Sequence, residues 1–285
     1  MESGSPGNFY RPPAADPLYH LVRQADGGID LARGALLIAR DAYPDLDIGS
    51  CLRRIRGLAA EVEPRVKGLG PREAVAELSR FLAVEQGFRG NADRYDDPRN
   101  SYLNDVLDRR LGIPITLSIL YIAVGRELGL PLAGINFPGH FLVRCAAVPD
   151  LVFVDPFSGG RVIDRAALER MLERLMGKGA VLDDSLLSAA APAQIFARML
   201  RNLRQIHAGL GDFERAVSAG ERITWLQPET ASDLRDLGYL HCRLGAFHRA
   251  LSCLDEYLRR SPGAEDAGTI ANDIALLQSR LAVLN

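Results

Sequence analysis

The sequence carries almost no net charge, and almost none of its basic residues are lysines. Its 34 basic and 36 acidic residues leave a formal charge of −2 on 285 residues, and only Lys67 and Lys178 are lysines. A chain this close to neutrality produces no strong field toward nucleic acid or an anionic membrane. Arginines that bind phosphate would be expected to cluster, whereas these are spread along the sequence. We therefore expect neither a nucleic acid nor a membrane among the partners.

Cysteines are few, and their spacing fits neither a disulfide framework nor a metal site. Cys51, Cys145, Cys242 and Cys253 form no CxxC pair. The chain is long enough to build a hydrophobic core without cross-links. The pattern is typical of reduced thiols, so we predict a cytoplasmic protein with no metal and no other cofactor.

The sequence also lacks an apolar run long enough to span a membrane. Its most apolar stretch, residues 111–125, stops at Arg126 and contains proline, threonine and serine. Such a stretch is typical of a buried helix. The N-terminus has no basic start followed by an apolar core, so it is not expected to be a signal peptide. Its glycines, prolines and serines predict a flexible lead-in over residues 1–16.

A repeat of 34 residues is present in the C-terminal part. Leucines at i and i+3, glycine at the turn, alanine at the helix contact and a final proline recur at this offset, as in the tetratricopeptide repeat. Residues 268–285 have helical apolar spacing and predict a capping helix. We assign residues 189–285 to two such repeats plus this helix, an all-α region offering a surface to a protein or peptide partner. The matching pairs are Leu200 and Leu234, Leu203 and Leu237, His207 and His241, Gly211 and Gly245, Phe213 and Phe247, Arg215 and Arg249, Ala216 and Ala250, and Pro228 and Pro262.

The preceding residues, 17–188, predict a mostly helical α+β domain. Apolar residues recur at spacings of three and four from Asp30 to Gly90. A helix opened by Pro114 and closed by Gly129 is apolar nearly all round and should be buried. Two strands follow, and the stretch VIDRAALERMLERLMG then predicts a further helix. Helices first and antiparallel strands later indicate the α+β class.

The two strands carry a histidine, a cysteine and an aspartate. In the stretch NFPGHFLVRC, alternation along a strand points His140 and Cys145 to opposite faces, so they cannot form a catalytic dyad. Cys145 is then a small core residue. Asp155, at the end of LVFVD, is a better partner because a carboxylate at a strand end can hold an imidazole. The alternative is a lone histidine and a turn aspartate before Pro156.

A polar stretch before the buried helix is a second candidate site. Tyr95, Arg99, Asn100 and Asn104 could line a cleft beside His140 and bind a polar ligand or peptide. The same stretch also has the composition of a capped turn, and both interpretations can hold together. Asn136 could direct its amide to the cleft or simply cap a strand.

The central motif resembles a known family. The stretch NSYLNDVLDRRLGIPITLSILYIAVGRELGLPLAGINFPGHFLVR, followed by FVDPF, is similar to the SirB-type bacterial proteins. These join a transglutaminase-like domain, cysteine-protease-like in its core, to tetratricopeptide repeats. The resemblance covers roughly Leu31 to the C-terminus. It implies catalytic His and Asp roles for His140 and Asp155.

The sequence departs from the superfamily at the nucleophile. The resemblance places a cysteine at the start of the buried helix, where the helix dipole would favour a thiolate. The segment GIPITLS offers only Thr116 and Ser118. Our first hypothesis is therefore a nucleophile-deficient protein acting in protein interaction or regulation. The second is a hydrolase or acyl transferase that acts on an amide or ester and uses Ser118 or Thr116 with His140 and Asp155.

Overall fold

The computed structural model describes residues 16–23, 28–147 and 152–284. The predicted flexible lead-in therefore lies outside the described residues, except for Asp16. That residue precedes α1 (Pro17–Val22), and its Oδ1 accepts a hydrogen bond of 2.8 Å from the amide of Leu18.

Contacts between residues divide the chain into two compact units. One unit is His20–Met199, and the other is Leu200–Asn285 together with the described residues up to Tyr19. This division falls eleven residues after the predicted boundary at 188, since 199 − 188 = 11. The short N-terminal segment joins the C-terminal unit because the Tyr19 ring meets the Trp225 ring edge-on, with centroids 5.5 Å apart.

Helices predominate in the first part of the larger unit. Aspartate side chains cap two of them: Asp30 accepts from the amide of Arg33, and Asp47 accepts from the amide of Ser50. Pro71 stands in the first turn of its helix, as predicted. The elements are α2 (Leu31–Ala39), α3 (Ile48–Val66), α4 (Pro71–Arg80), the π-helical turn η1 (Phe81–Glu85), the 3-10 turn η2 (Pro98–Asn100) and α5 (Leu103–Arg109).

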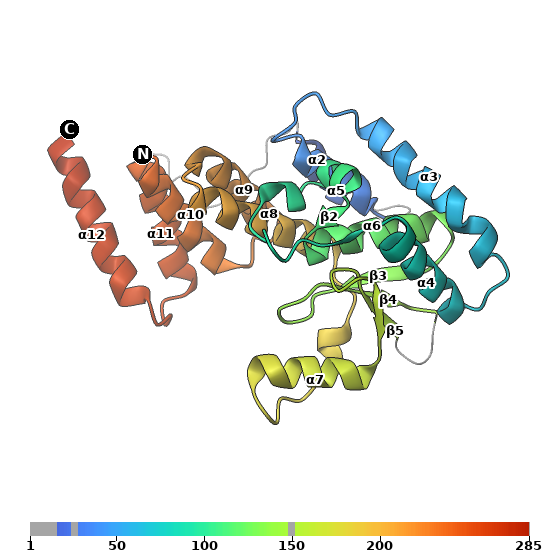
Figure 1. The fold of residues 1–285 in the computed structure, drawn as a ribbon. Coiled ribbons are helices and arrows are strands. Elements are labelled where there is room, and N and C mark those ends of the chain that lie inside the picture. The colour runs from blue at the N-terminus through green and yellow to red at the C-terminus, as the bar shows by residue number, and fades with distance from the viewer. Residues whose placement is uncertain (1–15, 24–27, 148–151, 285) are drawn as a thin grey trace. The chain divides into compact units, whose positions relative to one another are not determined.

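The predicted central helix is confirmed as α6 (Pro114–Glu127). Every residue from Pro114 to Ile122 is buried. A helix with so little polar surface is stable only when other elements surround it. Figure 1 shows α6 with the sheet on one side and the helices α2, α3 and α5 on the other.

A four-stranded antiparallel sheet follows, in the order β3-β4-β5-β6. The two predicted strands are present as β4 (Leu142–Cys145) and β5 (Val152–Asp155), while β3 (Leu132–Ile135) and β6 (Arg161–Ile163) were not predicted. A parallel pair of two-residue strands, β1 (Arg89–Gly90) and β2 (Leu111–Gly112), lies elsewhere in the unit.

One helix prediction needs correction at its start. Val162 and Ile163 belong to β6, and α7 begins only at Arg165 and ends at Met176. Asp164 separates the two elements because its carboxylate accepts a hydrogen bond of 2.8 Å from the amide of Ala167 and so caps the helix.

The sheet is covered on both faces, as the strand alternation requires. A Cβ on Gly134 would meet Phe141 and Ile122, so this face of the sheet packs on α6. Residues of the other face pack on Leu168 and Leu172 of α7, which lies on the opposite side of the sheet from α6 (Figure 1). The residues on the α7 face are Ile135, Leu142, Phe153 and Ile163.

The C-terminal unit contains the predicted repeats. Leu237 and Leu240 pack on Ala216 and Cys253, and the capping helix adds Ile270 to the next cluster. The turns inside the two hairpins contain Gly211 and Gly245 with φ of +78° and +72°, values that favour glycine. The helices are α8 (Pro192–Gly209), which belongs to this unit only from Leu200 on, α9 (Phe213–Leu226), α10 (Ala231–Arg243), α11 (Phe247–Arg260) and α12 (Ala267–Leu284).

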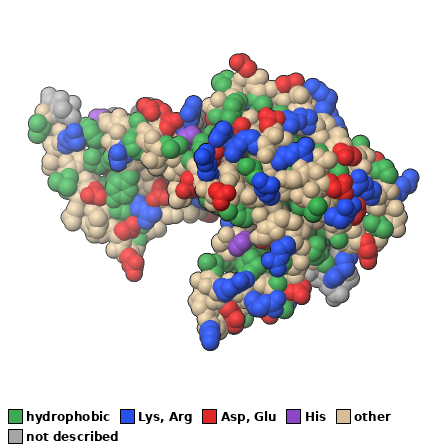
Figure 2. Space-filling view, in the orientation of Figure 1, with side chains coloured by type: hydrophobic (Ala, Val, Ile, Leu, Met, Phe, Trp, Pro, Cys, Tyr) green, Lys and Arg blue, Asp and Glu red, His purple; other side chains and the backbone are tan. Residues whose placement is uncertain are grey.

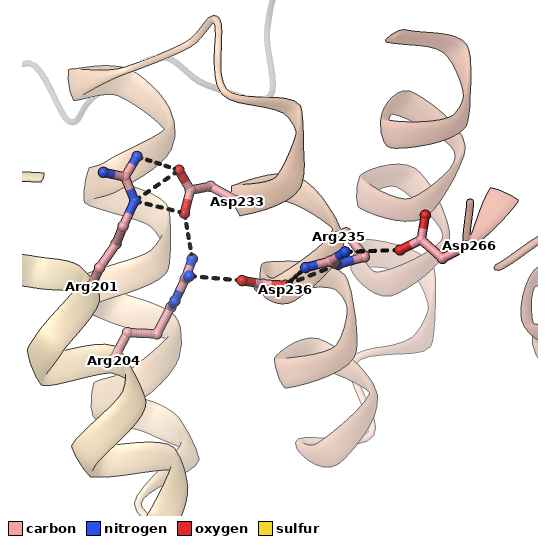
Figure 3. A network of polar contacts seen from close by, with 6 residues as sticks. All are labelled: Arg201, Arg204, Asp233, Arg235, Asp236 and Asp266. Atoms are coloured by element: carbon pink, nitrogen blue, oxygen red, sulfur yellow. Dashed lines mark hydrogen bonds and ion pairs between the residues drawn. The ribbon is translucent and has the colours of Figure 1, made fainter. Parts of the chain in front are cut away.

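A network of charges links successive helices of these repeats. Arg201 of α8 donates to Asp233 of α10, and Arg235 of α10 donates to Asp266, just before α12 (Figure 3). Arg204 and Asp236 connect the two pairs. Arg201 and Arg235 are 34 residues apart, so the network follows the repeat itself. The donor–acceptor distances are Arg201 Nη2 to Asp233 Oδ2 2.6 Å, Arg204 Nη1 to Asp233 Oδ1 2.9 Å, Arg204 Nη2 to Asp236 Oδ2 2.8 Å, Arg235 Nε to Asp236 Oδ1 3.0 Å and Arg235 Nη1 to Asp266 Oδ2 2.8 Å.

Candidate functional site

A tight turn sets the position of His140. The amide of His140 donates to the carbonyl of Phe137 at 3.0 Å, with Pro138 and Gly139 between them. Gly139 has a φ of +70°. Proline followed by a residue with positive φ is the signature of a type II turn. Phe137 is buried in the α7-side core, so the turn is anchored and carries the imidazole to the end of the sheet.

The end of β5 sets the position of Asp155. Its register partner on β6 is Arg161. Its carboxylate caps the following turn: Oδ1 accepts from the amide of Ser158 at 3.1 Å, and Oδ2 accepts from the Ser158 hydroxyl at 2.7 Å. The turn closes through Gly160, whose amide donates to the carbonyl of Asp155 at 2.9 Å. Asp155 is therefore a turn aspartate as well as a neighbour of the histidine.

The imidazole and the carboxylate lie close together without forming a hydrogen bond. His140 Nδ1 is 3.7 Å from Asp155 Oδ2, beyond the usual hydrogen-bond range. The nearer partner of that oxygen is the Ser158 hydroxyl. The side chain of His140 is 35% exposed and that of Asp155 only 6%. The pair can form an ion pair when the imidazole is protonated, but it does not show the short contact of a formed His–Asp dyad.

Both residues line a cavity of about 640 Å³. Its walls come from the turn 138–140, the end of β5, the strand β6 and one side of α7. Of the described residues that line it, none belongs to α6. Figure 2 shows basic side chains gathered over the α7 region. The lining is Pro138, Gly139, His140, Asp155, Ser158, Arg161, Ile163, Ala167, Arg170, Met171, Arg174 and Leu175.

The two predicted hydroxyl nucleophiles lie elsewhere. Ser118 is fully buried, and its hydroxyl donates to the carbonyl of Phe141 at 3.1 Å. Thr116 is also fully buried, and its hydroxyl contacts the carbonyl of Asn100 at 2.6 Å and the amide of Ile113 at 3.2 Å. These contacts close the start of α6. Neither hydroxyl lines the cavity that contains the imidazole.

The four cysteines also lie away from the cavity. Cys145 is buried in β4 on the face that packs on α6, consistent with a core residue. Burial raises the pKa of the Cys51 and Cys242 thiols, and it raises that of Cys253 to about 12. A raised pKa disfavours the thiolate, which is the nucleophilic form. All four cysteines are free.

The polar stretch before α6 forms a turn stabilised from within. Asn100 is fully buried, donates to the carbonyls of Arg94 and Tyr95, and accepts from Asn91 at 3.0 Å. Arg99 forms a paired contact with Asp97, at 3.0 Å through Nε and 2.8 Å through Nη2. These partners satisfy the side chains that we expected to be available for a ligand.

The other expected residues are also placed away from the cavity. Asn104 is buried, and its Oδ1 has no hydrogen-bond partner within the described chain. Tyr95 meets the Phe157 ring edge-on at 5.9 Å, and burial raises the pKa of its hydroxyl. Asn136 accepts a hydrogen bond of 2.9 Å from Arg198. Tyr95, Arg99, Asn100, Asn104 and Asn136 are absent from the lining of this cavity, and their role in binding a ligand stays a prediction.

The residues missed by sequence reasoning are the arginines of the cavity. Arg161 faces it from β6, and Arg170 and Arg174 face it from α7. The spacing of four between Arg170 and Arg174 could have predicted that they share one side of the helix, since residues i and i+4 do so. Their meeting with Arg161 depends on how α7 packs on the sheet. Among the described residues there is no group of three or more metal-binding side chains. No helix of the described chain is long and apolar enough to cross a membrane.

Comparison with known proteins supports the two-part organisation. A family model described as "Transglutaminase-like superfamily" matches residues 50–201, and one described as "Tetratricopeptide repeat" matches residues 203–275. A UPF0162 protein of Xylella fastidiosa (strain 9a5c) is 40% identical over 227 residues, or 76% of this chain and 80% of the relative.

More distant relatives share smaller parts. A UPF0162 protein of Pseudomonas aeruginosa is 34% identical over 206 residues, or 71% of this chain and 74% of the relative. F-box only protein 21 of Mus musculus is 34% identical over 138 residues, or 45% of this chain and 21% of that protein. No solved structure matches the chain.

Proposed function

We propose a function on the premise that the chain belongs to the UPF0162 family and that its residues 50–201 belong to the transglutaminase-like superfamily. In this proposal the chain is a nucleophile-deficient transglutaminase-like protein that acts in protein interaction or regulation. The cavity beside His140 binds a peptide or small ligand without cleaving it. The tetratricopeptide repeats bind a partner protein or peptide.

The observation that carries this proposal is the lining of the cavity. The described residues that line it include a histidine and an aspartate but no thiol. Its one hydroxyl, that of Ser158, donates to Asp155 at 2.7 Å. A serine nucleophile needs an adjacent base that accepts its proton, normally an imidazole. A hydroxyl held by a carboxylate in a turn serves to cap that turn.

The second candidate function is a hydrolase or acyl transferase for an amide or ester. It is favoured by the His140–Asp155 separation of 3.7 Å, which a small shift would turn into a hydrogen bond. It is opposed by the contacts of the two hydroxyls with backbone carbonyls: Thr116 with Asn100 at the end of η2, and Ser118 with Phe141 just before β4. A substrate would have to displace those contacts and reach fully buried atoms. We therefore favour binding over catalysis.

We also propose a cytoplasmic location. All four cysteines are free, and three are buried, as in proteins that fold in a reducing compartment. The near-neutral charge favours a protein partner over nucleic acid.

The test measures hydrolysis and acyl transfer by the full chain and by its His140→Ala variant, with a glutamine-containing peptide and a p-nitrophenyl ester as substrates. We expect equal background rates, because no nucleophile among the described residues contacts the imidazole. The variant should fold, since the side chain of His140 is one-third exposed. A wild-type rate that His140→Ala abolishes would overturn the proposal. If Ser118→Ala abolished the same rate as well, the second candidate function, a hydrolase or acyl transferase, would be established.

A further inference from the structure

Three arginines face the cavity beside His140, and no carboxylate of the described residues pairs with them. Arg161, Arg170 and Arg174 form no ion pair within the described chain, and the Nε of Arg174 donates only to the carbonyl of Arg170, at 3.2 Å. The single carboxylate of the lining, Asp155, is held by the turn that follows it. Three guanidinium groups against one carboxylate leave an excess of two positive charges, 3 − 1 = 2, before the imidazole is counted.

Another arginine of the same helix is paired with carboxylates. At the start of α7, the Nη1 of Arg165 lies 2.7 Å from Asp184 Oδ1, and its Nε lies 3.4 Å from Glu169 Oε1. Acidic residues are therefore within reach of α7 on the sides that do not face the cavity. The unpaired arginines are confined to the side that does, which is where an external carboxylate could enter.

An apolar ridge runs beside the two arginines of α7. Ala167, Met171 and Leu175 recur at a spacing of four and line the cavity. Ala167 and Met171 are half-buried and also pack against the core cluster that contains Leu168 and Leu172, so Leu175 is the exposed member of the ridge. Leu175 is 56% exposed and so offers an apolar contact at the rim of the cavity. The cavity thus offers cationic and apolar surface side by side.

The spacing of the charges fits a polypeptide. Arg170 and Arg174 are four residues apart on α7, which is about 6 Å along a helix axis. Alternate side chains of an extended chain lie on one side, roughly 6.6 Å apart. Two carboxylates two residues apart on a ligand can therefore each meet one guanidinium, and guanidinium and carboxylate pair with two parallel hydrogen bonds.

We propose that this cavity binds an acidic segment of a partner polypeptide, with its carboxylates on Arg170, Arg174 and Arg161 and an apolar side chain against Leu175. The inference rests on the proposed function and names the ligand class of that same cavity. Its basis is charge complementarity together with the exposed apolar side chain of Leu175. The overall neutrality of the chain hides this local excess of positive charge.

The experiment measures binding of the full chain to a fluorescein-labelled heptapeptide, Glu-Leu-Glu-Gly-Glu-Leu-Glu, by fluorescence anisotropy at low salt. The test variant is Arg170→Gln with Arg174→Gln. Both side chains are exposed, so the fold should be kept. The variant should bind at least about tenfold more weakly, because each charge-assisted hydrogen bond is among the stronger contacts of a protein. The matched control is Arg56→Gln with Arg72→Gln, which removes the same charge from exposed positions outside the cavity.

Two further peptides test each half of the inference. A peptide with glutamine in place of every glutamate should bind at least tenfold more weakly, and one with glycine in place of leucine should bind several-fold more weakly. Equal binding of the glutamine peptide, or equal loss in the test and control variants, would overturn the inference. Equal binding of the glycine peptide, with release by millimolar inorganic phosphate, would also overturn it and indicate a small-oxyanion site.

The fate of the peptide separates this inference from the proposed function. Mass spectrometry of the bound peptide should show it intact. Bound and intact peptide supports both claims, whereas absence of binding overturns the inference and leaves the missing nucleophile unaffected. Peptide that is bound and then cleaved or transferred would support the binding site and overturn the nucleophile-deficient function.

Discussion

The charge network of the repeats makes Asp233 a strong test of how the C-terminal unit is held together. Its side chain is only 3% exposed and accepts hydrogen bonds from Arg201 and Arg204 (Figure 3). Removing one member of a buried ion pair typically costs about 3–5 kcal/mol, since the other charge is left buried. Here the cost should be smaller. Arg201 is 32% exposed and can regain water, and Arg204 keeps Asp236 at 2.8 Å.

We therefore expect Asp233→Ala to lower the free energy of unfolding of this unit by about 2–3 kcal/mol. The assay is urea unfolding of the full chain, followed by circular dichroism and by the fluorescence of Trp225, the single tryptophan. The control is Glu221→Ala, which removes a half-exposed partner of Arg249 and should cost less than about 1 kcal/mol. Equal losses in the two variants would refute the reasoning, because burial would then make no difference to the value of a pair.

Two further predictions concern packing and pH. Gly34→Ala should destabilise the larger unit by about 1–3 kcal/mol, because its Cβ would lie 2.1 Å from a ring carbon of the fully buried Phe196. Gly57→Ala on α3, with open space around it, should stabilise by about 0.5–1 kcal/mol, and urea midpoints that fail to separate the two would contradict the packing argument. Burial lowers the pKa of His207 and of His241 below the usual 6.5, so the unfolded chain binds more protons in acid and stability should fall as the pH drops below about 6.5. Replacing both histidines with glutamine should flatten this dependence of the urea midpoint, and an unchanged slope would exclude them as its cause.

Much of the fold could be predicted from the sequence because its signals are local. Pro114 and Gly129 mark the ends of α6, and the apolar residues between them fill a buried helix. The 34-residue offset likewise predicts the helical hairpins. Strand β6 was missed because it is three residues long and runs directly into a helical pattern, and only the Asp164 cap divides the two.

The candidate site was predictable only in part. The order of the motifs placed His140 near Asp155, but it could not show that Ser158 is the closer partner of the carboxylate. The polar stretch before α6 has the composition of a ligand site. Asn100 shows why composition misled, since its side chain is satisfied within its own turn. The arginines of the cavity come together only when α7 packs on the sheet.

The periodic ion pairs of the repeats also bear on how such an array can be lengthened. Each pair joins an arginine on one repeat to an aspartate 31 or 32 residues later, so the connection has a direction along the chain. A further 34-residue module inserted before α12 would be accepted electrostatically if it brought an aspartate for Arg235 and a new arginine for Asp266. A module without them would leave the guanidinium of Arg235 and the carboxylate of Asp266 without their ion-pair partners. The network therefore accepts only repeats that supply the matching arginine and aspartate. A designer could use this requirement to build longer versions of the array.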